Sequence, residues 1–177
     1  DVASGHATPL TGDGHLGGFA VRGDALVYAL DSLNAPADLY SVDLAAPSKP
    51  LQLTSVNADR LADVRFGDYE QFSFPGWHNE IVYGYVMKPW NYRKGKKYPV
   101  AFLIHGGPQG SWTDDFHYRW NPETYAGQGF AVVAINFHGS TGYGQAFTDA
   151  ISQHWGDRPL EDLKAGWNAA LKQFPFL

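Results

Sequence analysis

The stretch HGGPQGSW, residues 105–112, directly follows the apolar run YPVAFLI and does not turn back as a hairpin. Its two consecutive glycines, Gly106 and Gly107, leave backbone N–H groups that no side chain shields. Such N–H groups can donate hydrogen bonds to an oxyanion that develops on a substrate carbonyl. The alternative is a tight strand-to-loop turn without chemistry, and in either case we expect His105 to orient the loop.

A nucleophile for such an oxyanion is missing from the sequence. The elbow that presents a catalytic serine in α/β-hydrolases reads G-x-S-x-G. Ser140 has Gly142 after it but His138 before it. With no cysteine in the chain, a thiol nucleophile and a disulfide are also excluded. Glycine does not flank both second positions of any of the serines, which are Ser4, Ser32, Ser41, Ser48, Ser55, Ser73, Ser111, Ser140 and Ser152.

The histidines raise the question of a metal site, and the sequence argues against one. No two of them have the i, i+4 spacing of a helical metal pair, and no carboxylate–histidine motif accompanies them. We therefore expect no metal and no cofactor. The four that lie close in sequence are His105, His117, His138 and His154.

A second glycine-rich loop, GSTGYG at residues 139–144, could be mistaken for a phosphate cradle. It lacks the lysine and the G-x-x-x-x-G-K spacing of a phosphate-binding loop. We interpret it as a turn that lines the site, with Tyr143 facing a pocket. Trp112 follows the first loop and is the tryptophan that we expect to line the same pocket.

The elements that must position these loops lie in residues 67–177. Strands are predicted at 69–74 and 80–89, and two nearly continuous apolar runs, 98–104 and 130–137, are typical of strands buried on both faces. A helix is expected from Asn121, with Pro122 at its first turn and Glu123 near its positive end. A last helix near Pro159 should bury Leu160, Leu163, Trp167, Leu171 and Phe174 on one face. Alternating strands and helices indicate an α/β fold with a parallel sheet.

Residues 1–66 have a different pattern. Short runs rich in Val, Leu, Tyr and Phe, at 17–21, 25–30, 38–44 and 51–54, alternate with turn residues. Four short antiparallel strands match one blade of a β-propeller. One blade would leave apolar faces exposed, so we expect it to be the end of something longer.

Composition limits the classes of partner. The net charge is −5 and the pI is about 5.7, which argues against nucleic acid. The basic segment KPWNYRKGKK, residues 88–97, is interpreted as a solvated hairpin turn. No apolar run approaches the length that spans a bilayer, and the first residues show no signal-peptide pattern. We expect no membrane contact.

The motifs together resemble the prolyl oligopeptidase (S9) family of serine peptidases, in the branch of dipeptidyl-peptidase V and acylaminoacyl peptidase. HGGPQGSW, FAVVAINFHGSTGYGQAFTDAI and WGDRPLEDL carry the resemblance in residues 105–163. DLYSVDL, LQLTSVN and EQFSFPGWHNEIVYGYVMKP resemble the family's last propeller blade and the entry into its peptidase domain.

The resemblance implies an N-terminal half of an α/β-hydrolase domain (67–177) preceded by the last blade of a β-propeller (1–66). It places one oxyanion donor on Gly107, with Gly106 beside it. The Ser-Asp-His triad would lie outside this chain, so we expect a fragment that is inactive alone and pairs with the remaining C-terminal part of the protein. The parent would hydrolyse short peptides.

Two other functions stay open. An esterase or lipase uses the same kind of loop, although a propeller blade upstream argues against it. Alternatively, the chain is a non-catalytic binding or antigenic fragment, whose exposed strands and sheet edge supply adhesive surface. The resemblance favours a secreted protein, with a cytoplasmic location as the alternative.

Overall fold

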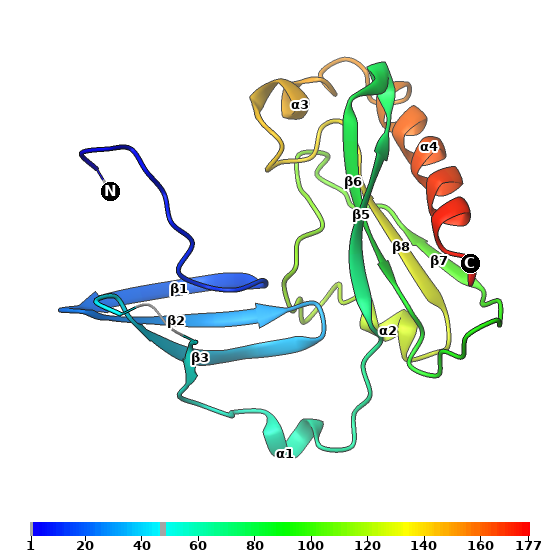
Figure 1. Cartoon of the computed structure of the whole chain (residues 1–177). Helices are drawn as coiled ribbons and strands as arrows, with labels where there is room; N and C mark the ends of the chain where they lie inside the picture. Colours follow the sequence, from blue (N-terminus) through cyan, green and yellow to red (C-terminus); the bar gives the residue numbers. More distant parts are fainter. Residues whose placement is uncertain (1, 47–48) are drawn as a thin grey trace. The chain divides into compact units, whose positions relative to one another are not determined.

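The computed structural model describes residues 2–46 and 49–177, which form two compact units (Figure 1). Unit 1 consists of Asp1–Val64 with Asp114–Arg119, and unit 2 of Arg65–Thr113 with Trp120–Leu177. Within the described residues, no helix is both long and apolar enough to cross a bilayer.

Unit 1 contains one antiparallel sheet, formed by β1 (His15–Arg22), β2 (Ala25–Ser32), β3 (Ala35–Asp43) and β4 (Leu51–Gln52) in that order, followed by the short helix α1 (Ala58–Leu61). Its small core surrounds Leu26, Tyr28 and Val42. Phe19 and Val21 of β1 are exposed. A single sheet of this size therefore leaves much of its apolar surface uncovered, as the sequence predicts.

A short segment from the second half of the chain belongs to unit 1. Asp114 accepts a hydrogen bond from the N–H of Leu33 at 2.9 Å, and Asp31 accepts one from the N–H of Phe116 at 3.0 Å. These side-chain contacts satisfy two backbone donors that lie outside the strands.

Unit 2 is an α/β unit with a mixed sheet in the order β5-β6-β8-β7. β5 and β6 form an antiparallel hairpin, β6 pairs with β8 antiparallel, and β7 pairs with β8 in parallel. In Figure 1, α4 lies along one face of this sheet. The elements are β5 (Tyr69–Pro75), the 3₁₀ turn η1 (Trp77–Asn79), β6 (Ile81–Met87), β7 (Val100–Leu103), α2 (Glu123–Ala126), β8 (Ala131–Asn136), α3 (Gln145–Asp149) and α4 (Arg158–Gln173).

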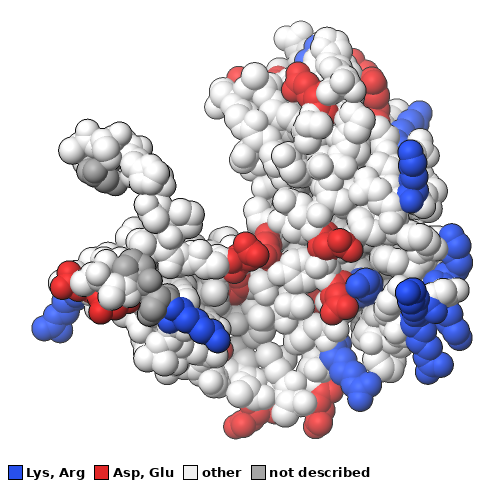
Figure 2. Space-filling model, viewed as in Figure 1, with Lys and Arg blue, Asp and Glu red and all other residues white. Residues whose placement is uncertain are grey.

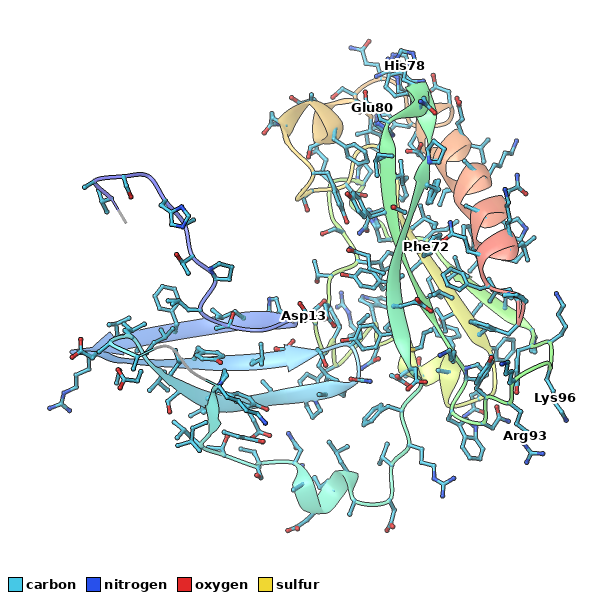
Figure 3. All side chains as sticks on the ribbon, viewed as in Figure 1. Asp13, Phe72, His78, Glu80, Arg93 and Lys96 are labelled. Carbon is cyan, nitrogen blue, oxygen red and sulfur yellow. The ribbon has the colours of Figure 1, made fainter. Side chains whose placement is uncertain are left out.

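β8 is one of the two inner strands of this sheet, and its burial follows from its sequence. All six of its residues are buried, as expected for a continuous apolar run covered on both faces. The neighbouring core residues Phe72, Phe74 and Val82 come from the β5–β6 hairpin, and Figure 3 labels Phe72 within this sheet.

The prediction that 98–104 is buried on both faces is wrong. All four residues of β7 are only partly buried, and Ile104, just beyond the strand, is 57% exposed. Among the strands that the structure describes, β7 pairs only with β8 and is therefore an edge strand. An apolar sequence indicates that a strand can be buried on both sides, but it does not supply the neighbour that would bury it.

The predicted buried face of the last helix is wrong in part. Leu160 and Leu171 are 47% and 41% exposed. The helix instead packs on the sheet through small residues, with Gly166 at the contact: a Cβ added there would lie 2.6 Å from Phe74 and 2.8 Å from Ile135. Buried on α4 are Pro159, Asp162, Gly166 and Ala170.

The basic segment 88–97 is not a hairpin turn, because β8 lies between β6 and β7. It is a connection across the end of the sheet, exposed over residues 93–97. Lys and Arg side chains gather on this side of unit 2 in Figure 2, and in Figure 3 Arg93 and Lys96 extend away from the sheet.

Candidate active-site loop

The loop 105–108 begins two residues after Leu103, the last residue of β7, and exposes its two glycines. Within the described residues, the N–H groups of Gly106 and Gly107 donate to no protein acceptor. Gly107 has a φ of +129°, where a Cβ would lie 2.8 Å from the backbone nitrogen of Gln109, whereas a Cβ on Gly106 would meet nothing within 4 Å. Glycine at 107 is thus required by the backbone, and the space in front of Gly106 is open.

His105 is held at the start of the loop by both ring nitrogens. Nδ1 lies 3.0 Å from the carbonyl oxygen of Gly106 and, since a carbonyl only accepts, Nδ1 carries the proton. Nε2 lies 2.8 Å from Ser140 Oγ, and the ring stacks on Phe137 with centroids 4.4 Å apart. Burial lowers the pKa of His105, which favours the neutral ring, so Nε2 accepts the Ser140 hydroxyl proton.

The Ser140–His105 contact has the form of a nucleophile–base pair. Ser140 is, however, completely buried, and its backbone closes a turn: its N–H donates to Phe137, and its carbonyl accepts from Thr148 Oγ1. No substrate carbonyl can reach Oγ there. The pair therefore fixes the loop, as a side-chain bridge between residues 35 apart.

Trp112 and Tyr143 are brought together by a residue that the sequence reasoning missed. Asn136, fully buried at the end of β8, accepts the N–H of Trp112 at 2.7 Å and donates to the Trp112 carbonyl at 2.8 Å. Its Nδ2 also donates to Tyr143 Oη at 2.7 Å. The available signal was an amide that ends an otherwise apolar strand.

Tyr143 packs in the core of unit 2 and stacks on Tyr83, with ring centroids 5.5 Å apart. Burial is the main cause that raises its pKa. Whether Tyr143 and Trp112 line a substrate pocket stays a prediction.

His138 lies in a separate polar cluster at the end of the β5–β6 hairpin. Its Nδ1 is 2.6 Å from Asp162 Oδ2, and its Nε2 is 3.3 Å from Glu80 Oε2. Asp162 is fully buried and also accepts the N–H groups of Trp77 and His138. Figure 3 labels Glu80 and His78 at this tip. Across residues 2–46 and 49–177, no group of three or more His, Asp or Glu is arranged to hold a metal.

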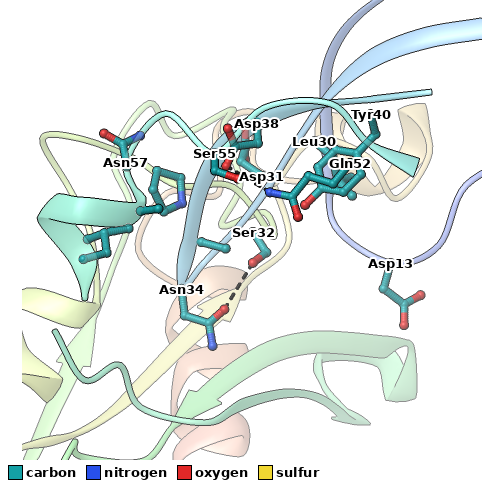
Figure 4. A pocket seen from close by; sticks show the side chains of 14 residues that line it. Asp13, Leu30, Asp31, Ser32, Asn34, Asp38, Tyr40, Gln52, Ser55 and Asn57 are labelled. Carbon is teal, nitrogen blue, oxygen red and sulfur yellow. Dashed lines mark hydrogen bonds between the residues drawn. The ribbon is translucent and has the colours of Figure 1, made fainter. Parts of the chain in front are cut away.

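A cavity of about 430 Å³ lies within unit 1 (Figure 4). Asp13, Asp31 and Asp38 line it, together with neutral residues and no basic side chain. Asp38 already accepts from Thr54 and the N–H of Val56, and Asp31 from the N–H of Phe116. These two carboxylates hold the fold, and none of the predicted site residues lines this cavity.

An apolar groove of about 360 Å³ runs between the β7 end of the sheet and α4 in unit 2. Its lining includes Phe102 and Ile104, from β7 and the residue that follows it. From the helix it includes Leu160, which was predicted to be buried but is exposed. The groove therefore lies beside β7, the edge strand of the sheet. The full lining is Phe102, Ile104, Leu160, Leu163, Lys164, Trp167 and Asn168.

Comparison with known proteins gives consistent relatives. The model of the prolyl oligopeptidase family matches residues 116–177. Dipeptidyl-peptidase 5 of Schizosaccharomyces pombe is 53% identical over 98 residues, which cover 55% of this chain and 14% of that protein. Probable dipeptidyl-peptidase 5 of Aspergillus clavatus is 44% identical over 142 residues, covering 78% of this chain and 20% of that protein.

Among solved structures, the acylaminoacyl peptidase of Pyrococcus horikoshii superimposes with a TM-score of 0.79 at 26% identity. The match covers 94% of this chain and 26% of that one. The chain thus spans about a fifth or less of the length of the two curated relatives.

Proposed function

Because this chain belongs to the prolyl oligopeptidase family of peptidases, we propose that it is part of a serine peptidase that hydrolyses short peptides, in the manner of a dipeptidyl or acylaminoacyl peptidase. The observation that carries the proposal is the pair of exposed N–H groups at Gly106 and Gly107, which donate to no acceptor in the described part of the chain. Unengaged donors in a fixed loop are what an oxyanion hole needs.

In the proposed reaction, a serine hydroxyl attacks the carbonyl carbon of the peptide, and a histidine takes the hydroxyl proton. The carbonyl oxygen becomes negative and accepts the N–H of Gly107, while the N–H of the residue after the nucleophile supplies the second donor. Each such donor stabilises the transition state by about 3–4 kcal/mol. The C–N bond then breaks, and the histidine returns its proton to the leaving amine; a water that gives a proton to the same histidine next hydrolyses the acyl-serine ester and frees the serine.

The triad of this peptidase lies outside residues 1–177 in our proposal. Ser140, which has a histidine partner, is inaccessible. The exposed edge of β7, with its apolar groove along α4, is suited to receive another strand of the sheet. We further propose that unit 1 is the last blade of a β-propeller and unit 2 the first half of an α/β-hydrolase domain.

The first test is the mass of the natural protein under denaturing conditions, followed by labelling with a fluorophosphonate that reacts with activated serines. We expect a mass well above 19.5 kDa and one labelled serine outside the 177 residues. Stoichiometric labelling of a serine within the chain would refute the location of the triad.

The second test separates the enzyme classes. Dipeptidyl and N-acyl-peptide chromogenic substrates should be hydrolysed with higher kcat/KM than short-chain nitrophenyl esters. The opposite preference would indicate an esterase, and no turnover of either substrate by the folded, unlabelled protein would leave a binding protein as the better explanation.

A further inference from the structure

We propose that Asn136 and Ser140 are positioning residues that hold the loop 105–112 in the shape of an oxyanion hole. The proposal rests on the proposed function for its catalytic part, but the holding of the loop can be measured without catalysis. Both side chains are fully buried, and both hydrogen-bond to the loop from the segment that ends β8 and follows it.

Asn136 binds the far end of the loop. Its one amide engages both backbone groups of Trp112, at 2.7 and 2.8 Å, as a neighbouring strand would. The third contact, to Tyr143 Oη, uses the remaining N–H. Since an amide has one acceptor and two donors of use here, no other side chain of this size satisfies all three partners. An aspartate would have the shape but would place a carboxylate oxygen against the Trp112 carbonyl.

Ser140 binds the near end of the loop through His105. The hydroxyl donates to Nε2, which leaves Nδ1–H to bind the Gly106 carbonyl. That carbonyl belongs to the peptide group whose N–H is on Gly107. The hydroxyl of Ser140 thereby reaches, through the histidine ring, the peptide group that carries the proposed oxyanion donor.

A backbone contact lies between the two side-chain contacts: the N–H of Thr141 donates to the Gly110 carbonyl at 3.0 Å. The loop is therefore held at His105, Gly110 and Trp112, and the exposed stretch 106–109 is left free to face a substrate. Donors fixed in advance need no reorganisation when charge develops, which is the source of their catalytic value.

The same contacts admit a competing role, in which Ser140 is itself a nucleophile activated by His105. Complete burial of Ser140 argues against it. The two roles differ in a measurable way, because a nucleophile is labelled by a fluorophosphonate and a positioning residue is not.

The experiment uses the complete natural protein with three variants: Ser140→Ala, Asn136→Asp and, as a control, Ser152→Ala, whose side chain is exposed. Hydrogen–deuterium exchange of peptides that cover 105–112 reports the loop directly. We expect exchange about tenfold faster in the first two variants and unchanged in the control. A thermal unfolding scan verifies that each variant is folded.

Kinetics then tests the catalytic part. We expect kcat for a dipeptidyl substrate to fall about 10- to 100-fold with KM little changed, as for a misplaced donor. Unchanged exchange in both variants overturns the proposal, and so does faster exchange with unaltered kcat. Loss of serine labelling in Ser140→Ala alone would make Ser140 the nucleophile and also overturn it. Wild-type protein without peptidase activity would refute the proposed function, whereas the exchange data would still decide whether the loop is held.

Discussion

At the residue scale, the two glycines of the loop have different tasks. A Cβ on Gly106 would enter open space, while Gly107 has a φ that side chains rarely adopt. We predict that Gly106→Ala leaves the free energy of unfolding unchanged but lowers peptide turnover at least about tenfold, by obstructing the approach to the oxyanion donors.

Gly107→Ala should instead destabilise the fold by about 1–3 kcal/mol, the typical cost of a strained backbone position. Urea unfolding and hydrolysis rates of the two variants check both statements. Full turnover in a folded Gly106→Ala protein would contradict an oxyanion role for this loop.

Glu123 makes the free energy of unfolding depend on pH, and the direction of this dependence follows from its raised pKa. Its carboxylate is buried and faces the N–H of Gly67 with both oxygens, at 3.0 and 3.1 Å. Desolvation is the main cause that raises its pKa from 4.5 to about 7, against the opposing effect of the Gly67 hydrogen bond. The folded state therefore binds more protons than the unfolded state between these values, and stability falls as the pH rises through this window.

We predict that this fall is absent in the Glu123→Gln variant. The free energy of unfolding of the variant minus that of wild type should therefore rise between about pH 4.5 and about pH 7, and should stay constant above about pH 7. Urea titrations at intervals of one pH unit measure the difference. The exposed Glu70→Gln serves as the control, and a wild-type minus variant difference that does not change with pH would refute the assignment.

At the element scale, Asp162 joins α4 to the ends of two other elements. From the first turns of the helix it accepts the N–H of Trp77 in η1 at 2.7 Å and the N–H of His138 after β8 at 2.6 Å. The apolar periodicity of this helix in the sequence gave no role to Asp162. Its neighbours across space could not be read from that pattern.

We predict that Asp162→Asn destabilises the protein by about 2–4 kcal/mol, since the amide turns a donor toward backbone donors in a buried site. Glu161→Gln, one residue earlier and exposed, should change stability by less than about 0.5 kcal/mol. Equal urea midpoints for the two variants would show that the contacts of Asp162 contribute little.

The same helix shows why periodicity misplaced the buried face. Apolar residues every three or four positions marked Leu160 and Leu171, but the sheet accepts the side of α4 where Gly166 lets the backbone come close. A hydrophobic pattern records which side chains tolerate burial. It does not record the distance of closest approach, which here depends on Phe74 and Ile135.

At the scale of the whole molecule, the net charge bears on whether the chain can bind nucleic acid. The chain carries a net charge of −5, although basic side chains gather along 88–97 (Figure 2). We predict no binding of a short DNA duplex at concentrations up to about 10 µM in physiological salt, because the acidic remainder opposes phosphate contact. Fluorescence anisotropy measures this, and salt-sensitive binding that Arg93→Glu with Lys96→Glu abolishes would restore a nucleic-acid role. The compartment of the protein stays a prediction.

The sequence by itself determined the α/β character of unit 2, the strands on either side of the HGGP loop, the family, and the absence of a nucleophile elbow. These are local features, set by runs of apolar residues, glycines and short motifs. Only the tertiary structure decided that β7 is an edge, which side of α4 is buried, and that Asn136 and Ser140 hold the loop. The first two depend on how strands and helix pack in space. The last depends on partners 24 and 35 residues away, and hydrogen bonds between distant residues leave no periodic trace in the chain.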